Sequence, residues 1–321
     1  MNIPLLLQLR EAGGEFVPVE SLGASQNRTL ADLEELLEFG FSIEQHPYLG
    51  AAYRGPATRL CPDQIEHRLG TRRVGRRVAV WNRVGSTNDL AARAAASTAN
   101  EGLVVLAEEQ SAGRGRRGRT WSARAGSSIL MSVLLFPVGS LDEPSWLTAM
   151  GAVAVSEVVS EWTGRRAAIK WPNDVRVNGR KVAGILVERA AGSVIGIGLN
   201  ANSTQDDFPA DLRETATSLR LLLGSPVDRS ELARDLIQSL DAHYDESIRE
   251  GAEALSAAWR DRSEHLGSLV RITTPTGTIE GRLVDLSLTA GLELREGDGR
   301  TVILSARHVH SIVTATELTP P

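Results

Sequence analysis

Residues 113–119 combine four arginines with three glycines, and Trp121 follows two positions later. Glycine lets backbone N–H groups come close to a ligand, and guanidinium groups donate to phosphate or carboxylate oxygens. A solvated basic run or a nucleic-acid contact is the ordinary explanation of an Arg/Gly stretch. This stretch is short, lies between two predicted strands and leads to Trp121, which can anchor it in apolar packing. We therefore expect a loop that clamps an anion.

A second polar cluster occupies residues 170–174, which read Lys-Trp-Pro-Asn-Asp between two predicted strands. Pro172 restricts the backbone, while Lys170, Asn173 and Asp174 offer a cation, an amide and a carboxylate within five residues. An ordinary polar turn would have the same composition. The cluster indicates a binding site only in combination with the arginine-rich stretch.

Two apolar strands also contain unusual residues. Lys181 introduces the first, in which Gly184 permits the close approach of a ligand or another backbone, and a surface lysine is the ordinary alternative. Gly196, Gly198 and Asn200 mark the second strand, where glycines often serve packing alone. Each signal is weak by itself.

A fifth group, Ser86, Thr87 and Asn88, precedes a predicted helix. Helix capping explains such residues, and the free N–H groups of a helix start can also hold a polar ligand.

The elements that must carry these residues alternate between strand and helix from about residue 78 to residue 265. Alternating apolar residues predict strands at residues 78–83, 102–108, 127–135, 167–170, 174–177, 181–189 and 193–199. Helices are predicted at residues 88–96, 144–162 and 230–262. The short strand spacings between residues 167 and 199 favour hairpins. We therefore expect a largely antiparallel sheet backed by helices, and not a Rossmann domain.

The amino-terminal segment predicts a helix, a short helix, a helix and a hairpin, at residues 3–11, 19–24, 25–39 and 41–53. Ser25 suits an N-cap and Gly40 a C-cap of the third helix. This order suggests a winged helix-turn-helix. A linker that contains Pro56 and Pro62 follows it.

The carboxy-terminal segment, residues 267–313, has brief β-rich runs broken by glycines, which suits a small SH3-like barrel. A chain of 321 residues exceeds the comfortable size of one core. We expect an α+β protein of three domains: a winged helix-turn-helix (residues 1–60), a central mixed sheet backed by helices (residues 66–265) and the barrel (residues 267–316).

Composition limits the class of protein. With 35 basic and 40 acidic side chains the formal charge is −5, which argues against a protein that coats nucleic acid. The single cysteine, Cys61, excludes an internal disulfide and a multi-cysteine metal site. No apolar run approaches the length that a bilayer demands, and residues 1–10 lack a basic leader, so we expect a cytoplasmic protein.

Taken together and in this order, the five segments resemble the catalytic domain of the biotin protein ligases, also called biotin-acetyl-CoA-carboxylase ligases. Members carry a Ser-Thr-Asn helix start, a Gly-Arg-Gly-Arg-Arg-Gly-Arg loop before a tryptophan, a Lys-Trp-Pro-Asn-Asp turn, a Lys-x-Ala-Gly-Ile-Leu-x-Glu strand and a Gly-x-Gly-x-Asn strand; all five stand in this sequence. The resemblance covers most of the chain, and the arginine-rich loop is its most specific part. It implies a class II synthetase-like central domain.

The resemblance also implies the residues of the site. Those expected to bind biotin are Ser86, Thr87, Asn88, Gln110, Arg114, Gly115, Arg116 and Lys181. Those expected on the nucleotide side are Arg116, Arg119, Trp121, Asn173, Asp174, Lys181 and Asn200. Of these, Arg114, Arg116 and Lys181 would act catalytically, by stabilising negative charge in the transition state. Mg²⁺ would accompany ATP, although no motif identifies its ligands.

The implied reaction first makes biotinyl-5'-AMP from biotin and ATP and then transfers biotin to a lysine of a biotin carboxyl carrier protein. Some family members also repress biotin-synthesis genes through an amino-terminal winged helix and dimerise through the central sheet. A repressor that senses ligand and a ligase for another small acid such as lipoate are therefore alternatives, and a homodimer is possible. Residues 1–60 carry four arginines against eight acidic residues, a net charge of four minus eight, or −4, which weighs against DNA binding. Retention of Lys181 and of the whole loop favours activity over sensing alone.

Overall fold

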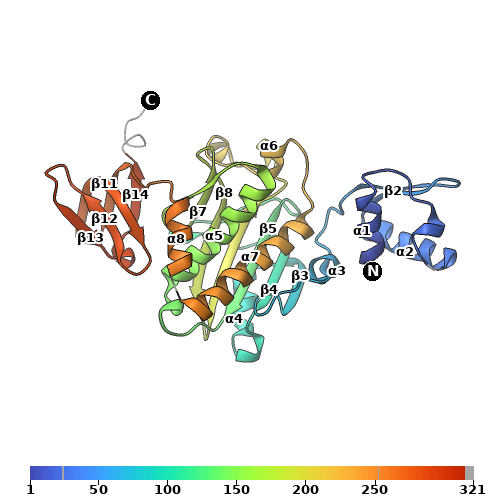
Figure 1. Ribbon diagram of the computed structural model, residues 1–321, viewed down its shortest axis with the longest axis horizontal. Helices are drawn as coiled ribbons and strands as arrows, with labels where there is room; N and C mark the ends of the chain where they lie inside the picture. The colour runs from blue at the N-terminus through green and yellow to red at the C-terminus, as the bar shows by residue number, and fades with distance from the viewer. Residues whose placement is uncertain (24, 252, 315–321) are drawn as a thin grey trace. The chain divides into compact units, whose positions relative to one another are not determined.

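The computed structural model describes residues 1–23, 25–251 and 253–314, and the chain divides into two compact units (Figure 1). The first unit contains Met1–Leu69 together with Val227–Arg234. The second contains Gly70–Pro226 and the chain from Asp235 onward. The two units share one long helix, α7 (Arg229–Glu250), whose first turns belong to the first unit.

The first unit confirms the order of elements predicted at the amino terminus. Helix α1 (Ile3–Glu11) is followed by a single 3-10 turn (Val19–Ser21), helix α2 (Gln26–Phe39) and a hairpin of β1 (Ser42–His46) and β2 (Gly50–Gly55). The predicted second helix is thus only a turn, and residue 24, with which its prediction ended, lies outside the described residues. A short helix, α3 (Pro62–Glu66), was not predicted.

The packing of the first unit follows from the leucine spacing of its helices. Leu5, Leu6 and Leu9 of α1 and Leu33 and Leu36 of α2 form a buried core. Helix α2 ends at Gly40, whose φ of 113° lies in the left-handed region that glycine adopts readily. Ser25 stands at the N-cap, but its side chain makes no capping hydrogen bond.

The second unit contains a seven-stranded sheet in the order β3-β4-β5-β9-β8-β7-β6. Its strands are β3 (Arg77–Val84), β4 (Leu103–Gln110), β5 (Ser128–Leu135), β6 (Ala167–Lys170), β7 (Asp174–Val177), β8 (Arg180–Arg189) and β9 (Ser193–Asn200). In the described part of this sheet β3 and β4 are parallel, and all other neighbours are antiparallel. The predicted mixed, largely antiparallel sheet is confirmed.

Helices pack on this sheet. The remaining ones are α4 (Thr87–Ala94), α5 (Pro144–Thr163), α6 (Leu219–Leu223) and α8 (Glu253–Arg262). Helix α5 contacts β6, β8 and β9 and is buried over most of its surface, and Figure 1 shows it lying across the sheet. Helix α4 contacts β4, β5 and β9.

The prediction of one helix over residues 230–262 is wrong. The structure has two helices, α7 and α8, separated at Gly251 and at residue 252, which lies outside the described residues. Gly251 has a φ of 84°, a left-handed conformation that ends a helix. The sequence is helical in its periodicity on both sides of this glycine, and one glycine is tolerated within many helical patterns. The break between the two helices could therefore not be predicted.

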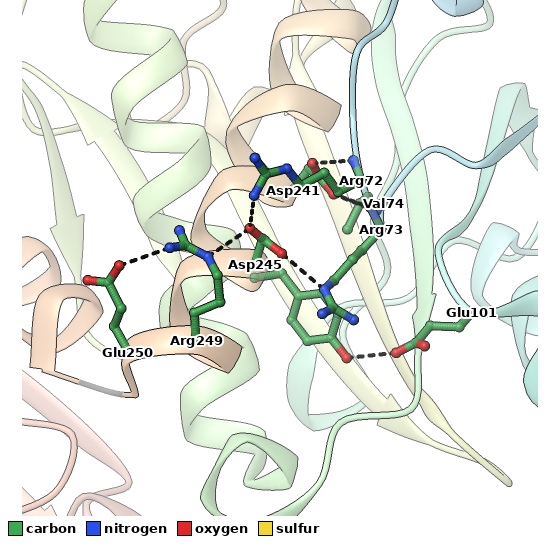
Figure 2. A network of polar contacts seen from close by, with 9 residues as sticks. Arg72, Arg73, Val74, Glu101, Asp241, Asp245, Arg249 and Glu250 are labelled. Atoms are coloured by element: carbon green, nitrogen blue, oxygen red, sulfur yellow. Dashed lines mark hydrogen bonds and ion pairs between the residues drawn. The ribbon is translucent and has the colours of Figure 1, made fainter.

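Carboxylates of α7 hold the segment that leads into β3, as Figure 2 shows. Asp241 accepts hydrogen bonds from the backbone N–H groups of Arg72, Arg73 and Val74 at 2.8, 2.7 and 2.7 Å. Asp245 accepts from the guanidinium groups of Arg72 and Arg73. These contacts fix the entry of the chain into the seven-stranded sheet.

The carboxy-terminal part of the second unit is a separate antiparallel sheet in the order β13-β12-β11-β10-β14. Its strands are β10 (Leu269–Thr274), β11 (Gly277–Ser287), β12 (Gly291–Arg295), β13 (Thr301–Leu304) and β14 (Ser311–Thr314). Among the described helices of the whole chain, none is long and apolar enough to cross a membrane.

Candidate active site

Glycines on two neighbouring strands make a flat area on the seven-stranded sheet. Gly184 of β8 is paired with Gly198 of β9, and a Cβ at Gly184 would lie 3.2 Å from the ring of Trp121. A Cβ at Gly198 would overlap with the same ring. The neighbouring residues Ile185 and Ile195 approach Gly151 of α5, so the glycines face away from that helix. Glycine at both positions is what allows the indole to lie on the sheet.

Lys181 lies beside this indole and is held by several contacts. Its Nζ is 5.5 Å from the centroid of the Trp121 ring and 2.6 Å from Oδ1 of Asp174. Its backbone N–H donates to the carbonyl of Thr215 at 2.7 Å, and its carbonyl accepts from the N–H of Thr217 at 2.8 Å. The lysine therefore stands in a defined place, between an aromatic face and a carboxylate.

The arginine-rich stretch, residues 113–119, turns back on itself. The N–H of Gly115 donates to the carbonyl of Arg119 at 2.7 Å, and the N–H of Trp121 donates to the carbonyl of Gly113 at 3.0 Å. Arg117 has a φ of 57°, an uncommon conformation for a residue with a side chain. The stretch is thus a narrow loop, which we call the arginine loop, and Trp121 joins its base to the glycine area.

Arg116 is the arginine of this loop that reaches the turn at residues 171–173. Its side chain is half-buried, and Nη1 lies 3.4 Å from Oδ1 of Asn173. Burial, followed by the charge of Arg117, lowers the pKa of Arg116. No carboxylate in the described chain forms an ion pair with it. Arg119, in contrast, is exposed, and its side chain makes no hydrogen bond or ion pair among the described residues.

Arg114 is engaged by two carboxylates. It donates to Asp89 through Nη1 (3.1 Å) and Nη2 (2.7 Å), and to Glu188 through Nε (3.2 Å) and Nη2 (2.9 Å). These contacts raise the pKa of Arg114 and lower that of Asp89. Burial alone would raise the pKa of Glu188, but hydrogen bonds from Arg114 and Asn88 outweigh it and lower that pKa.

The start of α4 forms a second polar group, together with the end of β4. Ser86 is a buried N-cap without a capping hydrogen bond from its side chain. Gln110 Oε1 accepts from Thr87 N at 2.7 Å and from Thr87 Oγ1 at 3.0 Å. Ser132 Oγ lies 2.7 Å from Thr87 Oγ1 and 2.5 Å from Asn88 Oδ1. Buried hydroxyl and amide groups therefore converge here.

Two residues of these groups were not predicted as part of a site. Ser132 is fully buried in the middle of the mostly apolar strand β5, and a polar residue within such a strand was the available signal. Glu188 stands at the end of the quoted motif on β8 without an assigned task, yet it accepts from Asn88 Nδ2 at 2.6 Å as well as from Arg114.

Two amides from the predicted set serve the backbone. Asn173 Nδ2 donates to the carbonyl of Ile185 at 2.8 Å, next to the cis Trp171–Pro172 bond. Asn200 Nδ2 donates to the carbonyl of Thr217 at 3.0 Å. Both amides thus position the segments on either side of Lys181.

The structure therefore brings the predicted residues together in two neighbouring groups. The first, at the glycine area, contains Arg116, Trp121, Asn173, Asp174 and Lys181. The second, at the start of α4, contains Ser86, Thr87, Asn88 and Gln110, and Arg114 joins the arginine loop to this group through Glu188. Arg119 contacts neither group through its side chain. Within the described ranges no three His, Cys, Asp or Glu residues are grouped so that they could hold a metal ion.

This arrangement suits a small molecule with a neutral polar head and an anionic end. Thr87, Asn88 and Gln110 can exchange donors and acceptors with the head. Arg116 and Lys181 present cations to phosphate or carboxylate oxygens, and Trp121 offers an aromatic face.

The chain is similar to proteins of known activity. A model of the Biotin/lipoate A/B protein ligase family matches residues 80–200. The Bifunctional ligase/repressor BirA of Bacillus subtilis is 31% identical over 306 residues, which cover 92% of this chain and 94% of that protein. The Biotin--[acetyl-CoA-carboxylase] ligase of Mycobacterium tuberculosis is 37% identical over 266 residues, 78% of this chain and 97% of that protein. Biotin protein ligase from Aquifex aeolicus, solved in complex with biotin and ATP, is 25% identical with a TM-score of 0.66, over 75% of this chain and 100% of that one.

Proposed function

The chain belongs to the biotin protein ligases of the biotin/lipoate A/B protein ligase family, and we propose that it activates biotin with ATP and transfers it to a lysine of a biotin carboxyl carrier protein. One observation carries the proposal at the level of the site. Lys181 and the Trp121 indole meet over the paired glycines 184 and 198, and Arg116 of the arginine loop reaches Asn173, the neighbour of the Asp174 that contacts Lys181. Such a group can hold an acyl phosphate against an aromatic nucleotide base.

In the first step a carboxylate oxygen of biotin attacks the α-phosphorus of ATP, and pyrophosphate leaves. Negative charge gathers on the α-phosphate oxygens as the new P–O bond forms. The cations of Arg116 and Lys181 stabilise that charge more in the transition state than in the reactants, because they are held in place beforehand. Asp174 keeps Lys181 oriented through their 2.6 Å contact.

In the second step the neutral amine of the acceptor lysine attacks the acyl carbon of the mixed anhydride. An amide forms and AMP leaves with the electrons of the broken acyl C–O bond. The protein contributes chiefly by positioning the adenylate and shielding it from water. No nucleophile from the chain is needed in either step.

The binding assignments are part of the proposal. Biotin contacts Ser86, Thr87, Asn88, Gln110, Gly115, Arg116 and Lys181, with Arg114 at the edge of that set. The nucleotide contacts Arg116, Arg119, Trp121, Asn173, Asp174, Lys181 and Asn200. The buried amide and hydroxyl groups near α4 support the first set, and the position of Trp121 beside Lys181 supports the second.

Mg²⁺ fits the site as a companion of the cosubstrate. It commonly binds to one or two carboxylates together with substrate phosphates and water, so a dedicated cage of protein ligands is not required. Asp174 contacts Lys181, and its charge also acts on Arg116. When bound with ATP, the ion offsets charge on the triphosphate.

We also propose the three domains and their folds. The order of α1, α2 and the β1–β2 hairpin supports a winged helix-turn-helix at residues 1–60. The mixed sheet with its helices supports a class II synthetase-like domain at residues 66–265. The five antiparallel strands support an SH3-like barrel at residues 267–316, of which the last two residues lie outside the described part. Dependence on ATP and on a carrier protein supports a cytoplasmic location.

A repressor role is the second candidate, and the relative from Bacillus subtilis, a bifunctional ligase and repressor, favours it. The charge of α2 weighs against this role, because Glu34, Glu35 and Glu38 are exposed and would repel the phosphates of DNA. Gln26, Asn27 and Arg28 at the start of this helix are also exposed and could reach bases. A gel shift on the organism's own biotin-operon promoter over a range of salt concentrations decides the matter. A specific complex that weakens as salt rises would support repression, and a palindromic bound sequence would indicate a homodimer.

A ligase for lipoate is less well supported. The dithiolane ring of lipoate has no hydrogen-bonding N–H or C=O groups, so Thr87, Asn88 and Gln110 would lose the partners that a ureido head offers. Adenylate formation measured with biotin and lipoate in competition distinguishes a biotin ligase from a lipoate ligase.

The direct test uses the full chain with ATP, biotin and a biotin carboxyl carrier domain, and reads the intact mass of the carrier. We expect one biotinyl group per carrier, which must be lost when ATP is omitted and when the acceptor lysine is replaced. A carrier of unchanged mass under all conditions, with the protein folded, would refute the proposal.

A further inference from the structure

Arg114 has little capacity left for a substrate. A guanidinium has five N–H donors, and the four hydrogen bonds to Asp89 and Glu188 use four of them. Two carboxylates also more than neutralise its charge. A phosphate near this side chain would meet a net negative group, so we do not assign Arg114 the transition-state role expected for it beside Arg116 and Lys181.

Glu188 is the residue that connects the arginine loop to the second group of the site. Its Oε2 accepts both from Arg114 Nη2 at 2.9 Å and from Asn88 Nδ2 at 2.6 Å. Asn88 in turn meets Ser132, and Ser132 meets Thr87. One carboxylate at the end of β8 thus holds the base of the arginine loop and the start of α4 at the same time.

A contact on the opposite side of Asn88 makes this position rigid. A Cβ at Gly196 would overlap with the Asn88 amide, so the amide lies directly on β9. The amide is therefore packed between β9 and the Glu188 carboxylate. The loop base is therefore tied to the sheet through Arg114, Glu188 and Asn88.

We propose that Glu188 is a positioning residue that fixes the arginine loop relative to the biotin-binding residues through Arg114. Asp89, which also accepts hydrogen bonds from Arg114, assists it. The inference rests on the proposed function and assigns a task to a residue that touches neither substrate. Arg114 serves as the anchor of the loop, and Arg116, two residues later, is thereby presented to the acyl phosphate. Loss of the anchor leaves the loop free to open, so that the adenylate escapes.

The test measures how long the full chain retains its adenylate. The protein is incubated with biotin and ATP labelled at the α-phosphate, passed through a desalting column, and the loss of bound label is followed. Glu188→Gln keeps the shape and an acceptor for Asn88 but removes the charge that holds Arg114. We expect it to release label roughly tenfold faster than the wild type, in line with the loss of one charge-assisted contact.

Three further variants define the mechanism. Arg114→Lys cannot make the forked contacts and should release label about as fast as Glu188→Gln, and the double variant should be no faster than either, because both changes break one connection. Glu188→Asp keeps the charge and should recover most of the retention. Arg189→Gln is the matched control, since Arg189 is the next residue on β8 and pairs with Asp142 instead.

The outcomes separate the two claims. If the wild type forms no labelled adenylate, the proposed function fails. If it does, and Glu188→Gln retains label as the wild type does, or the effects of Glu188→Gln and Arg114→Lys multiply, the positioning role is wrong. A loss of label that merely follows the fraction of unfolded protein, or that Arg189→Gln reproduces, also overturns it.

Discussion

Arg114 and Arg116 of the arginine loop have different roles because they have different neighbours. Arg114 is paired with Asp89 and Glu188, whereas Arg116 is half-buried next to the Asn173 amide and forms no ion pair with a carboxylate of the described chain. An arginine in the second situation keeps its charge for a ligand. The residue type alone predicted a cation at both positions, and only the surroundings distinguish an anchor from a substrate contact.

Replacing Arg116 tests the cation that faces the ligand. Arg116→Gly should let biotinyl-5'-AMP leave or hydrolyse roughly tenfold to a hundredfold faster, because one charge-assisted contact to the acyl phosphate is lost. Adenylate in solution is measured by chromatography during turnover without acceptor. Arg117→Gly is the control, since it removes the same charge from an exposed neighbour whose φ of 57° suits glycine. Equal leakage from both variants would contradict the assignment.

Replacing Lys181 tests the adenylation step. Lys181→Ala should slow the burst of pyrophosphate release roughly a hundredfold to a thousandfold, the usual effect of removing one preorganised transition-state contact. Rapid-quench measurement with the wild type alongside gives the burst rate. Arg180→Ala, the preceding residue of β8, which pairs with Glu214, should leave the rate unchanged. An undiminished burst in Lys181→Ala would remove this residue from the chemistry.

At the scale of the elements, β8 and β9 contribute to the site through their glycines, which leave space above the sheet. The paired glycines 184 and 198 allow Trp121 to lie on the sheet, and Gly196 does the same for Asn88. Both contacts bring loop residues to a strand surface that a Cβ would fill.

Gly198→Ala should displace the Trp121 indole, because the added methyl overlaps with the ring. We expect weaker binding of ATP by calorimetry and, from overpacking, a loss of about 1–3 kcal/mol in the free energy of unfolding. Gly297→Ala is the control, since a Cβ there meets nothing within 4 Å. Unchanged ATP affinity in Gly198→Ala would show that the indole does not contact the nucleotide.

The strands of the sheet could be predicted closely, because hairpins and alternation are local. Strands β6 and β7 match their predicted ranges, since Pro172 and Asn173 form the turn between them. The partners of Arg114 could not be predicted: Asp89 and Glu188 are 25 and 74 residues away in the sequence. Which distant residues meet depends on the order of strands in the sheet. Helices α3 and α6 were not predicted, because a helix of five residues is too short to show a helical period in the sequence.

At the scale of the whole molecule, acidic residues of α7 fasten the chain where it enters the second unit (Figure 2). A hydrogen bond from Arg73, with others from Arg249 and Arg72, lowers the pKa of Asp245 below its ordinary value. A carboxyl group with a lowered pKa in the folded state contributes stability above its ordinary pKa. That contribution disappears as the pH falls through the lower, folded value.

Asp245→Asn should therefore reduce the Tm at pH 7, and the difference from the wild type should shrink below about pH 4 as the wild-type carboxylate becomes protonated. Thermal unfolding followed by circular dichroism at several pH values gives both curves. Glu246→Gln removes the same charge from the next residue of α7 and should have little effect at either pH. A Tm difference that does not change with pH would mean that the charge of Asp245 is unimportant.

The central claim is that the arginine loop and Lys181 surround an activated acyl phosphate, and a crystal structure of the full chain with biotinyl-5'-AMP tests it most directly. We expect Arg116 and Lys181 within about 3 Å of the phosphate oxygens, the distance of a hydrogen bond, with Trp121 against the nucleotide. A bound adenylate far from residues 113–119, with their guanidinium groups in solvent, would contradict the account.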